Sequence, residues 1–157
     1  MSVKLGGFKM SFLEEINEKF EIVEVYALKS DDEKMLEEIY SSLTMNLPEE
    51  CRFIFDNYGY ITFEVMNPKG YEITISLSGP YGFLQDLRTL QDWPIENVGN
   101  VVPIGNDIGD MLYLYGTGNE GLGLYLAEVG ALHKDEYVKL ADSIFDFFCK
   151  GIGIDKL

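Results

Sequence analysis

Two short runs in the middle of the chain, residues 61–65 and 71–77, alternate strictly between apolar and polar side chains. An apolar residue at every second position is the period of a β-strand with one buried face. The tetrapeptide Asn67-Pro68-Lys69-Gly70 separates the two runs and contains the residues that favour turns. The segment therefore predicts an antiparallel hairpin that packs one face on a core and leaves the other face to solvent.

Helical patterns precede the hairpin. Ser11 and Ser30 are each followed three residues later by glutamate, the capping-box pattern, and apolar residues then recur at helical spacing. Pro48 with the two glutamates after it is typical of the start of another helix. We expect three helices and one β-prone stretch in this part of the chain: helices over 12–22, 30–46 and 47–57, and the β-prone stretch over 22–28.

The second half of the chain favours strands between two helices. The expected elements are a helix over 83–92, strands over 101–104, 111–115 and 122–129, and a last helix that is capped by Asp142 or Ser143 and ends near Lys150. Residues 116–121 are glycine-rich and predict a flexible hairpin loop. Strands and helices do not alternate along the chain, which argues against a parallel sheet. The order predicts an α+β fold with N-terminal helices, a central antiparallel β-sheet meander and a C-terminal helix packed on the sheet.

The charge of the chain limits its partners. Its 157 residues, the length of one domain, include 12 basic and 27 acidic residues, a net charge of −15. Such a charge repels nucleic-acid phosphates and anionic lipid headgroups, so we expect neither as a direct partner and expect attraction to a basic protein. The alternative is that the acidity only keeps the protein soluble. No apolar run reaches the roughly 18 residues of a membrane helix, and the N-terminus lacks a secretion signal, which predicts a cytoplasmic protein.

Candidate catalytic and metal-ligating groups are few. Cys51 and Cys149 are far apart, without a Cys-x-x-Cys pair or a Cys/His cluster, so we expect two reduced thiols and no zinc. His133, the only histidine, lies in a polar segment without a nearby nucleophile and is interpreted as a surface residue. Two carboxylates at any chosen spacing occur by chance in so acidic a chain. The sequence therefore predicts no enzyme activity and no cofactor.

The segment from Gly105 to Asp110 lies between two predicted strands and has three alternative interpretations. A phosphate loop needs a lysine beside its second glycine, and Asp110 stands there instead. A calcium loop would use the oxygens of Asn106, Asp107 and Asp110, but the ligand alternation and distant glutamate of an EF-hand are missing. The third interpretation is a turn in which Gly and Asn adopt positive φ angles, which explains every residue type except the two aspartates.

The only tryptophan, Trp93, precedes a proline and therefore favours an extended backbone. It is either a core side chain or an aromatic anchor for a partner protein. For a chain that binds a partner, we combine this anchor with the polar loop and the strand after it. The candidate partner-binding residues are Trp93, Asn106, Asp107, Asp110 and Tyr113.

Four features in a fixed order link the chain to a known family. They are the acidic helix over 31–43, the Leu47-Pro48-Glu49-Glu50 start of a helix that stops at Asn57-Tyr58-Gly59, the loop and strand over 103–113, and the closing helix over 141–148. In this order they resemble the SUKH superfamily, which joins bacterial immunity proteins to fungal regulators of cell-wall assembly. Ile108 departs from the family loop, which often carries consecutive glycines, and the usual aspartate-rich strand pair before the closing helix is missing.

The resemblance implies a single α+β domain over 30–157, preceded by a helical extension over 1–29, and no catalysis. It also implies an immunity protein that neutralises a cognate toxin, often a nuclease, by binding it. The charge agrees with this expectation, because a nuclease is basic and an acidic protein can occupy the surface that holds its substrate. The alternatives are a regulatory scaffold of the fungal type and a small-ligand or metal-binding module.

Overall fold

The predicted hairpin is present in the computed structural model, which describes residues 12–43 and 47–157. Strands β2 (Tyr60–Met66) and β3 (Glu72–Leu77) are antiparallel and share six residue pairs. The Asn67 side chain holds the turn between them, because its oxygen accepts hydrogen bonds from the N–H groups of Lys69 (3.0 Å) and Tyr71 (2.9 Å). The alternation in the sequence thus fixes both the strands and their register.

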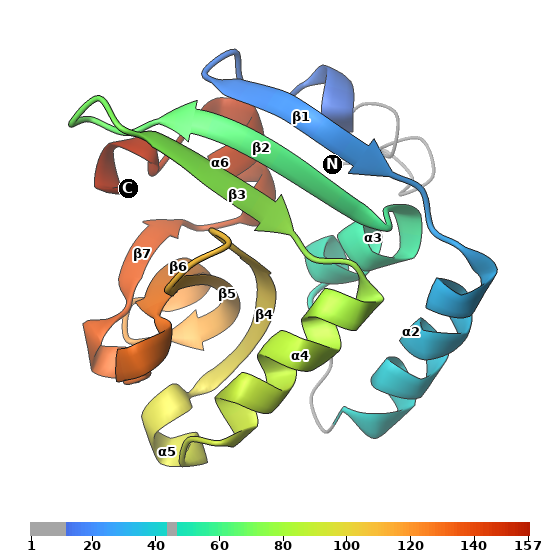
Figure 1. Ribbon diagram of the computed structural model, residues 1–157. Coiled ribbons are helices and arrows are strands. Elements are labelled where there is room, and N and C mark those ends of the chain that lie inside the picture. The colour runs from blue at the N-terminus through green and yellow to red at the C-terminus, as the bar shows by residue number, and fades with distance from the viewer. Residues whose placement is uncertain (1–11, 44–46) are drawn as a thin grey trace.

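The hairpin belongs to one seven-stranded sheet in which strand order follows chain order from β1 to β7 (Figure 1). The remaining strands are β1 (Phe20–Tyr26), β4 (Asn100–Asn106), β5 (Met111–Gly118), β6 (Gly121–Glu128) and β7 (Val138–Ala141). Each strand pairs antiparallel with the next. The predicted antiparallel meander is therefore confirmed.

Helices cover the sheet unevenly. They are α2 (Ser30–Ser42), α3 (Glu49–Asn57), α4 (Pro80–Gln91), α5 (Ile95–Val98) and α6 (Ile144–Lys150). In Figure 1, α3 and α6 lie behind β1–β3, whereas α4 runs beside β4 with α2 on its outer side. Within the part of the chain that the structure describes, no helix is both long and apolar enough to cross a membrane.

The sheet is narrowest in its middle. Strands β3 and β4 share only two residue pairs, Ser76↔Asn106 and Leu77↔Gly105, and this junction is called the seam below. Figure 1 shows β1–β3 as one layer on one side of the seam and β4–β7 curling away on the other. The seam therefore joins two halves of the sheet that are each held by much longer strand pairings.

The main core lies between the sheet and helices α3 and α6. Phe148 of α6 packs on Phe63 of β2 with ring centroids 4.7 Å apart, and Phe147 packs on Phe20 of β1 at 5.3 Å. A smaller second core, which includes Tyr125, lies on the other side of β4–β6. The second half of the sheet is thus buried on both faces, whereas the outer face of β1–β3 carries no helix among the described residues (Figure 1). The predicted C-terminal helix on the sheet is confirmed.

The prediction of a helix over 12–22 is wrong. Only residues 12–14 of this range are helical, and Phe20 already starts β1; the predicted cap Ser11 lies outside the described residues. The chain turns at Asn17, whose side chain accepts a hydrogen bond from Lys19 N–H and whose own N–H donates to the Phe148 carbonyl. Tertiary packing of Phe20 on α6 overrides the helical spacing. Residues 20–26, placed in the N-terminal extension by the sequence, are a strand of the main sheet.

Other boundaries also differ from the prediction. The glycine-rich segment is not a loop, because β5 and β6 continue to the pair Gly118↔Gly121 and leave a two-residue turn. Strand β7 and helix α5 were not predicted, and both are only four residues long. Helix α2 ends at Ser42, before the predicted end at Asn46, which lies outside the described residues. The outer face of the hairpin, predicted to face solvent, is partly buried. Thr62 and Ser76 on this face are both buried, and their hydroxyl oxygens lie 3.3 Å apart.

Glu50 of α3 connects parts of the chain that are far apart in sequence. Its carboxylate accepts a hydrogen bond from Ile144 N–H at the start of α6, at 2.8 Å, and further hydrogen bonds from the side chains of Tyr115 and Ser143. Burial raises the pKa of the Glu50 carboxyl above its ordinary value, although these donors act in the opposite direction. Glu50 and Ser143 thus accept hydrogen bonds from backbone N–H groups in the first turn of α6 that have no partner within the helix. The Ser143 hydroxyl accepts from Asp146 N–H.

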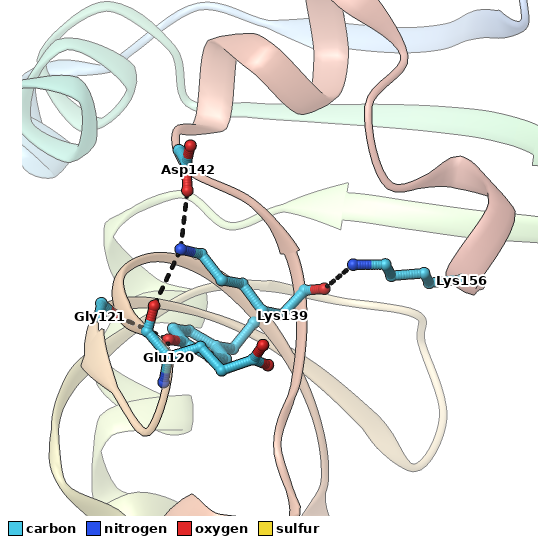
Figure 2. A network of polar contacts seen from close by, with 6 residues as sticks. Glu120, Gly121, Lys139, Asp142 and Lys156 are labelled. Carbon is cyan, nitrogen blue, oxygen red and sulfur yellow. Dashed lines mark hydrogen bonds and ion pairs between the residues drawn. The ribbon is translucent and has the colours of Figure 1, made fainter.

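A second polar network joins the β5–β6 turn to the C-terminal end of the chain (Figure 2). The Lys139 ammonium group of β7 lies 2.7 Å from the Asp142 carboxylate and donates to the Glu120 carbonyl at 3.0 Å. Lys156 in turn donates to the Lys139 carbonyl. These contacts connect three parts of the chain that are distant in sequence, so we interpret the network as a structural connection.

Candidate functional site

A hollow of about 360 Å³ opens at the seam, where β3, β4 and the start of α4 meet. Segments that are distant in sequence line it: Asp32 of α2, Gly59 and Tyr60 before and in β2, Ser76 and Ser78, the segment Gly79–Gly82, Asn106 at the end of β4 and Ile108 after it. We call it the seam hollow. Its volume lies in the range of ligand and side-chain binding pockets.

Glycines allow the backbone segments around the hollow to approach closely. A Cβ atom on Gly79 would overlap the carbonyl oxygen of Gly59, so the start of α4 can lie against the residue before β2 only because Gly79 has no side chain. A Cβ atom on Gly105 would likewise overlap the carbonyl oxygen of Ser76 across the seam. Gly105 is thus required for strand contact and not for a positive φ angle.

A half-buried carboxylate lies behind the wall of the hollow. The Asp86 side chain of α4 accepts a hydrogen bond from the Asn106 amide at 3.3 Å and one from the Ser78 hydroxyl at 3.5 Å. Burial raises the pKa of the Asp86 carboxyl, and the two donors act in the opposite direction. Both hydrogen-bond partners are neutral, and none of the ion pairs among the described residues includes Asp86, so no local cation balances its negative charge.

The loop between β4 and β5 is a turn held by its own side chains. The Asn106 side-chain oxygen accepts from Ile108 N–H at 2.9 Å, and Asp107 Oδ1 accepts from Met111 N–H at 3.1 Å. The turn interpretation of 105–110 is therefore the one that describes its geometry. The predicted use of Gly and Asn for positive φ is wrong, because the only non-glycine residue with positive φ in the described chain is Ile108, at 62°.

Ile108 is an unusual residue for this position. A β-branched side chain in the left-handed region is strained, at a cost on the order of 1–2 kcal/mol. Its side chain is nevertheless 69% exposed and lines the seam hollow, so burial does not offset the strain. Strained backbone of this kind is concentrated at functional sites in proteins.

Two tyrosines complete the rim of the hollow. Tyr81, in the first turn of α4, is 64% exposed. Tyr60 donates its hydroxyl hydrogen to the Glu24 carboxylate at 2.9 Å and stacks on Tyr26 with ring centroids 5.2 Å apart. The rim thus combines the exposed side chains of Tyr81 and Ile108 with the half-buried ring of Tyr60, and aromatic residues are enriched at binding hot spots.

Carboxylates lie at this rim and along the strands that lead away from it. The outer face of β1–β3 carries Glu21, Glu24, Glu64 and Glu72, and Asp32 lines the hollow itself. The three ion pairs among the described residues lie elsewhere, between residues 133 and 150, and include none of these carboxylates. Contact with Glu72 and the charge of Glu21 raise the pKa of the Glu64 carboxyl, as expected for acidic side chains without cationic partners.

The predicted partner-binding residues are in three separate places. Asn106 lines the seam hollow, and Asp107 and Asp110 belong to the turn beside it. Tyr113 is 1% exposed and packs in the main core near Phe147. Trp93 follows the other end of α4, about 18 Å away along a helix of this length, and packs against the second core. The structure therefore brings together only the three loop residues.

The reactive residue types lie away from the hollow. Cys51 is buried and Cys149 partly buried, and both are free thiols whose pKa is raised by burial. His133 lies 3.6 Å from the Asp135 carboxylate in an exposed turn. Within the described chain, no three His, Cys, Asp or Glu side chains lie close enough together to hold a metal ion.

Sequence reasoning missed Tyr60, Tyr81 and Asp86. Their positions depend on the approach of α4 to the seam, which no local pattern encodes. Ile108 was the one available signal, since an isolated β-branched residue inside a polar Gly/Asp turn is unexpected. No family model, curated protein or solved structure matches this chain.

Proposed function

We propose that this chain is a non-enzymatic binding protein, and specifically an immunity protein that neutralises a basic, nuclease-type toxin by direct binding in the cytoplasm. The immunity role rests on the resemblance to the SUKH superfamily. The observation that carries the binding role is the rim of the seam hollow. There, exposed Tyr81 and strained, exposed Ile108 lie near Asp32 and Glu24, which form no ion pair among the described residues. No cofactor is needed for such a role.

The chemistry of the rim supports a protein partner. Tyr60, Tyr81 and Ile108 supply apolar area that a partner can cover, and aromatic residues dominate the energetics of protein interfaces. Asp32 and Glu24 flank this area and favour lysine or arginine on the other side. An arginine side chain suits the hollow itself, because its guanidinium group can stack on a tyrosine ring and donate to the hydroxyl and amide oxygens of the wall.

The charge of the whole chain supports a basic target. A net charge of −15 attracts a nuclease, whose own surface must be positive to hold nucleic acid. Long-range attraction of this kind accelerates association and decreases as salt screens it. An immunity protein benefits from rapid capture, since the toxin acts on the host until it is bound.

We expect a neighbouring gene to encode a basic modular toxin, and the test is a binding titration of the purified protein against that toxin. Tyr81→Ala removes the exposed ring at the hollow, and we expect the dissociation constant to rise about tenfold or more. Tyr71→Ala is the matched control, because Tyr71 is equally exposed but lies at the far end of the hairpin. Its dissociation constant should remain within about twofold of the wild type.

Three results would contradict the proposal. The toxin fails to bind at all, which removes the immunity role. Tyr81→Ala and Tyr71→Ala have equal effects, which removes the seam hollow as the contact. The affinity is the same when the screening length falls from about 10 Å in 0.1 M salt to about 3 Å in 1 M salt, which removes the role of charge.

A further inference from the structure

We propose that the free edge of β1 binds an extended basic segment of a partner protein as an eighth strand, with its lysines or arginines on the outer face of the sheet and its apolar residues on the inner face. The inference rests on the proposed function, since it specifies how part of a basic partner is held. It concerns the edge of β1, which β2 and β3 separate from the seam, although Glu24 of β1 also contacts Tyr60 of the hollow.

The edge of β1 is open among the described residues. Strand β1 pairs with β2 on one side, and no described strand pairs with it on the other side. Four of its apolar side chains are well exposed: Ile22 at 37%, Val23 at 45%, Val25 at 44% and Tyr26 at 51%. Proteins usually protect such an edge with lysine, proline or a covering element, because its free N–H and C=O groups pair readily with another strand.

The strand itself lacks most of these protections. The sequence of β1 is Phe-Glu-Ile-Val-Glu-Val-Tyr, with no lysine and no proline. A register shift between Ile22 and Glu24 leaves Val23 as an extra residue, and this bulge is the only irregularity in the pairing. On both sides of the bulge the strand keeps regular pairing with β2, so an added strand has ordered backbone to follow.

The two faces of the edge differ in chemistry. Glu21 and Glu24 lie opposite Glu64 and Thr62 on the outer face, whereas Ile22 and Val25 lie opposite Phe63 and Ile61 on the inner face. A strand added to this edge places alternate side chains on the two faces. Basic residues would therefore meet the glutamates, and apolar residues would cover Ile22 and Val25. The pattern that fits is an alternation of lysine or arginine with valine or isoleucine.

A second copy of this chain fits the edge poorly. Two antiparallel copies of β1 would place Glu21 and Glu24 of each copy on the same face, where like charges destabilise strand pairing. Each copy also carries a net charge of −15, which opposes association at moderate salt. Charge complementarity thus selects a basic segment over self-association.

Hydrogen exchange at the β1 amides tests the proposal on the intact protein. The probe is a short peptide of alternating lysine and valine, added at about ten times its dissociation constant. We expect the outward-facing amides of residues 21–26 to exchange about tenfold more slowly, because a paired amide exchanges only from the unbound fraction. The β7 edge is the internal reference, because Val138 is exposed to a similar degree and its strand also ends the sheet.

Two control peptides separate strand pairing from simple charge attraction. A peptide of alternating lysine and proline keeps the charge but cannot form the ladder, and a peptide of alternating glutamate and valine keeps the ladder but reverses the charge. Neither should protect β1. Equal protection by the lysine–proline peptide, or protection of β7 but not of β1, would overturn the inference.

Protein variants give an independent result. Ile22→Thr combined with Val25→Thr keeps β-branched side chains while removing the apolar inner face of the edge, and Val138→Thr is the control on β7. The double variant should weaken binding of the lysine–valine peptide about fivefold or more relative to the control. If the peptides do not bind β1 but the toxin still binds in a salt-dependent way, the strand-addition proposal is rejected and the proposed function stands. Loss of toxin binding with positive peptide tests rejects the immunity role alone.

Discussion

Ser76 and Asn106 face each other across the seam, and theirs is one of the two paired positions of β3 and β4, next to the hydrogen bond from Ser78 N–H to the Ile104 carbonyl (2.9 Å). Both residues also line the seam hollow. The same narrow contact therefore holds the halves together and shapes the candidate binding site. A change that opens the seam should alter stability and binding together, whereas a change elsewhere on the rim should alter binding alone.

Gly105→Ala tests the closeness of the seam. The added methyl group would overlap the Ser76 carbonyl oxygen, so β3 and β4 would have to move apart. We expect the free energy of unfolding to fall by roughly 1–3 kcal/mol, measured by urea denaturation. Gly130→Ala is the control, because nothing lies within 4 Å of its added methyl group and its φ angle is not positive. Equal effects of the two substitutions would contradict this account of the seam.

Asn106→Ala tests the connection to Asp86. The substitution removes a donor to the half-buried carboxylate and an acceptor for Ile108 N–H, and should cost about 2 kcal/mol of stability at neutral pH. The donor lowers the pKa of Asp86, so its loss should raise that pKa further, as carbon-detected NMR titration would measure. Asn100→Ala, at an exposed position at the start of β4, should change neither quantity. An unchanged Asp86 pKa in Asn106→Ala would contradict the contact.

Local patterns predicted most of the fold. The alternation of apolar and polar residues over 61–77 predicts the two strands of the hairpin and, because one face of each strand is apolar, their register. The acidic residues after Ser30 and Pro48 lie in the first turns of α2 and α3. The positive end of the helix dipole stabilises negative charge there, so these residues mark the helix starts. The helix predicted over 12–22 is wrong because tertiary packing outweighs the local pattern there. The apolar spacing of these residues suits a helix, but Phe20 gains more by packing on α6 as part of a strand.

Most residues of the seam hollow could not be predicted from local sequence patterns. Asn106 could be chosen from its own segment, because polar side chains that hold a turn are visible as a local cluster. Tyr81 and Asp32 could not, because they come from helices that meet the loop only through the contact of α4 with the seam. Tyr113 was chosen as a surface residue because it follows the turn, but its side chain is buried. Alternate residues of a strand point to opposite faces, so a residue close to a surface turn can still point into the core.

Ile108→Gly tests whether strain is kept for function. Glycine adopts the φ angle of 62° without steric cost, so the substitution releases about 1–2 kcal/mol of strain and loses about 0.5–1 kcal/mol through chain entropy. We expect a gain in stability of about 0.5–1 kcal/mol together with weaker toxin binding, roughly tenfold. Ile95→Gly is the control, since Ile95 is exposed but has no positive φ, and it should give no gain in stability. A stabilised variant that binds at full strength would show that the side chain has no role in binding.

The buried Glu50 carboxyl predicts a pH dependence of stability with a definite sign. Burial raises its pKa in the folded protein above the ordinary value of 4.5, so the folded state binds a proton more tightly than the unfolded state does. The stability contributed by this proton is fully present below pH 4.5 and is lost as the pH rises through the raised value.

Glu50→Gln removes this titration and leaves a neutral side chain beside Ile144 N–H at every pH. The free energy of unfolding of the wild type, minus that of Glu50→Gln, should therefore decrease as the pH rises from 4.5 and become constant above the folded pKa. Urea denaturation at a series of pH values measures this difference. Glu49→Gln is the control, because Glu49 is the exposed neighbour in the same helix turn, and its difference from the wild type should lack this decrease. A difference for Glu50→Gln that grows with pH would mean that the donors at α6 outweigh burial, and that the Glu50 pKa is lowered instead.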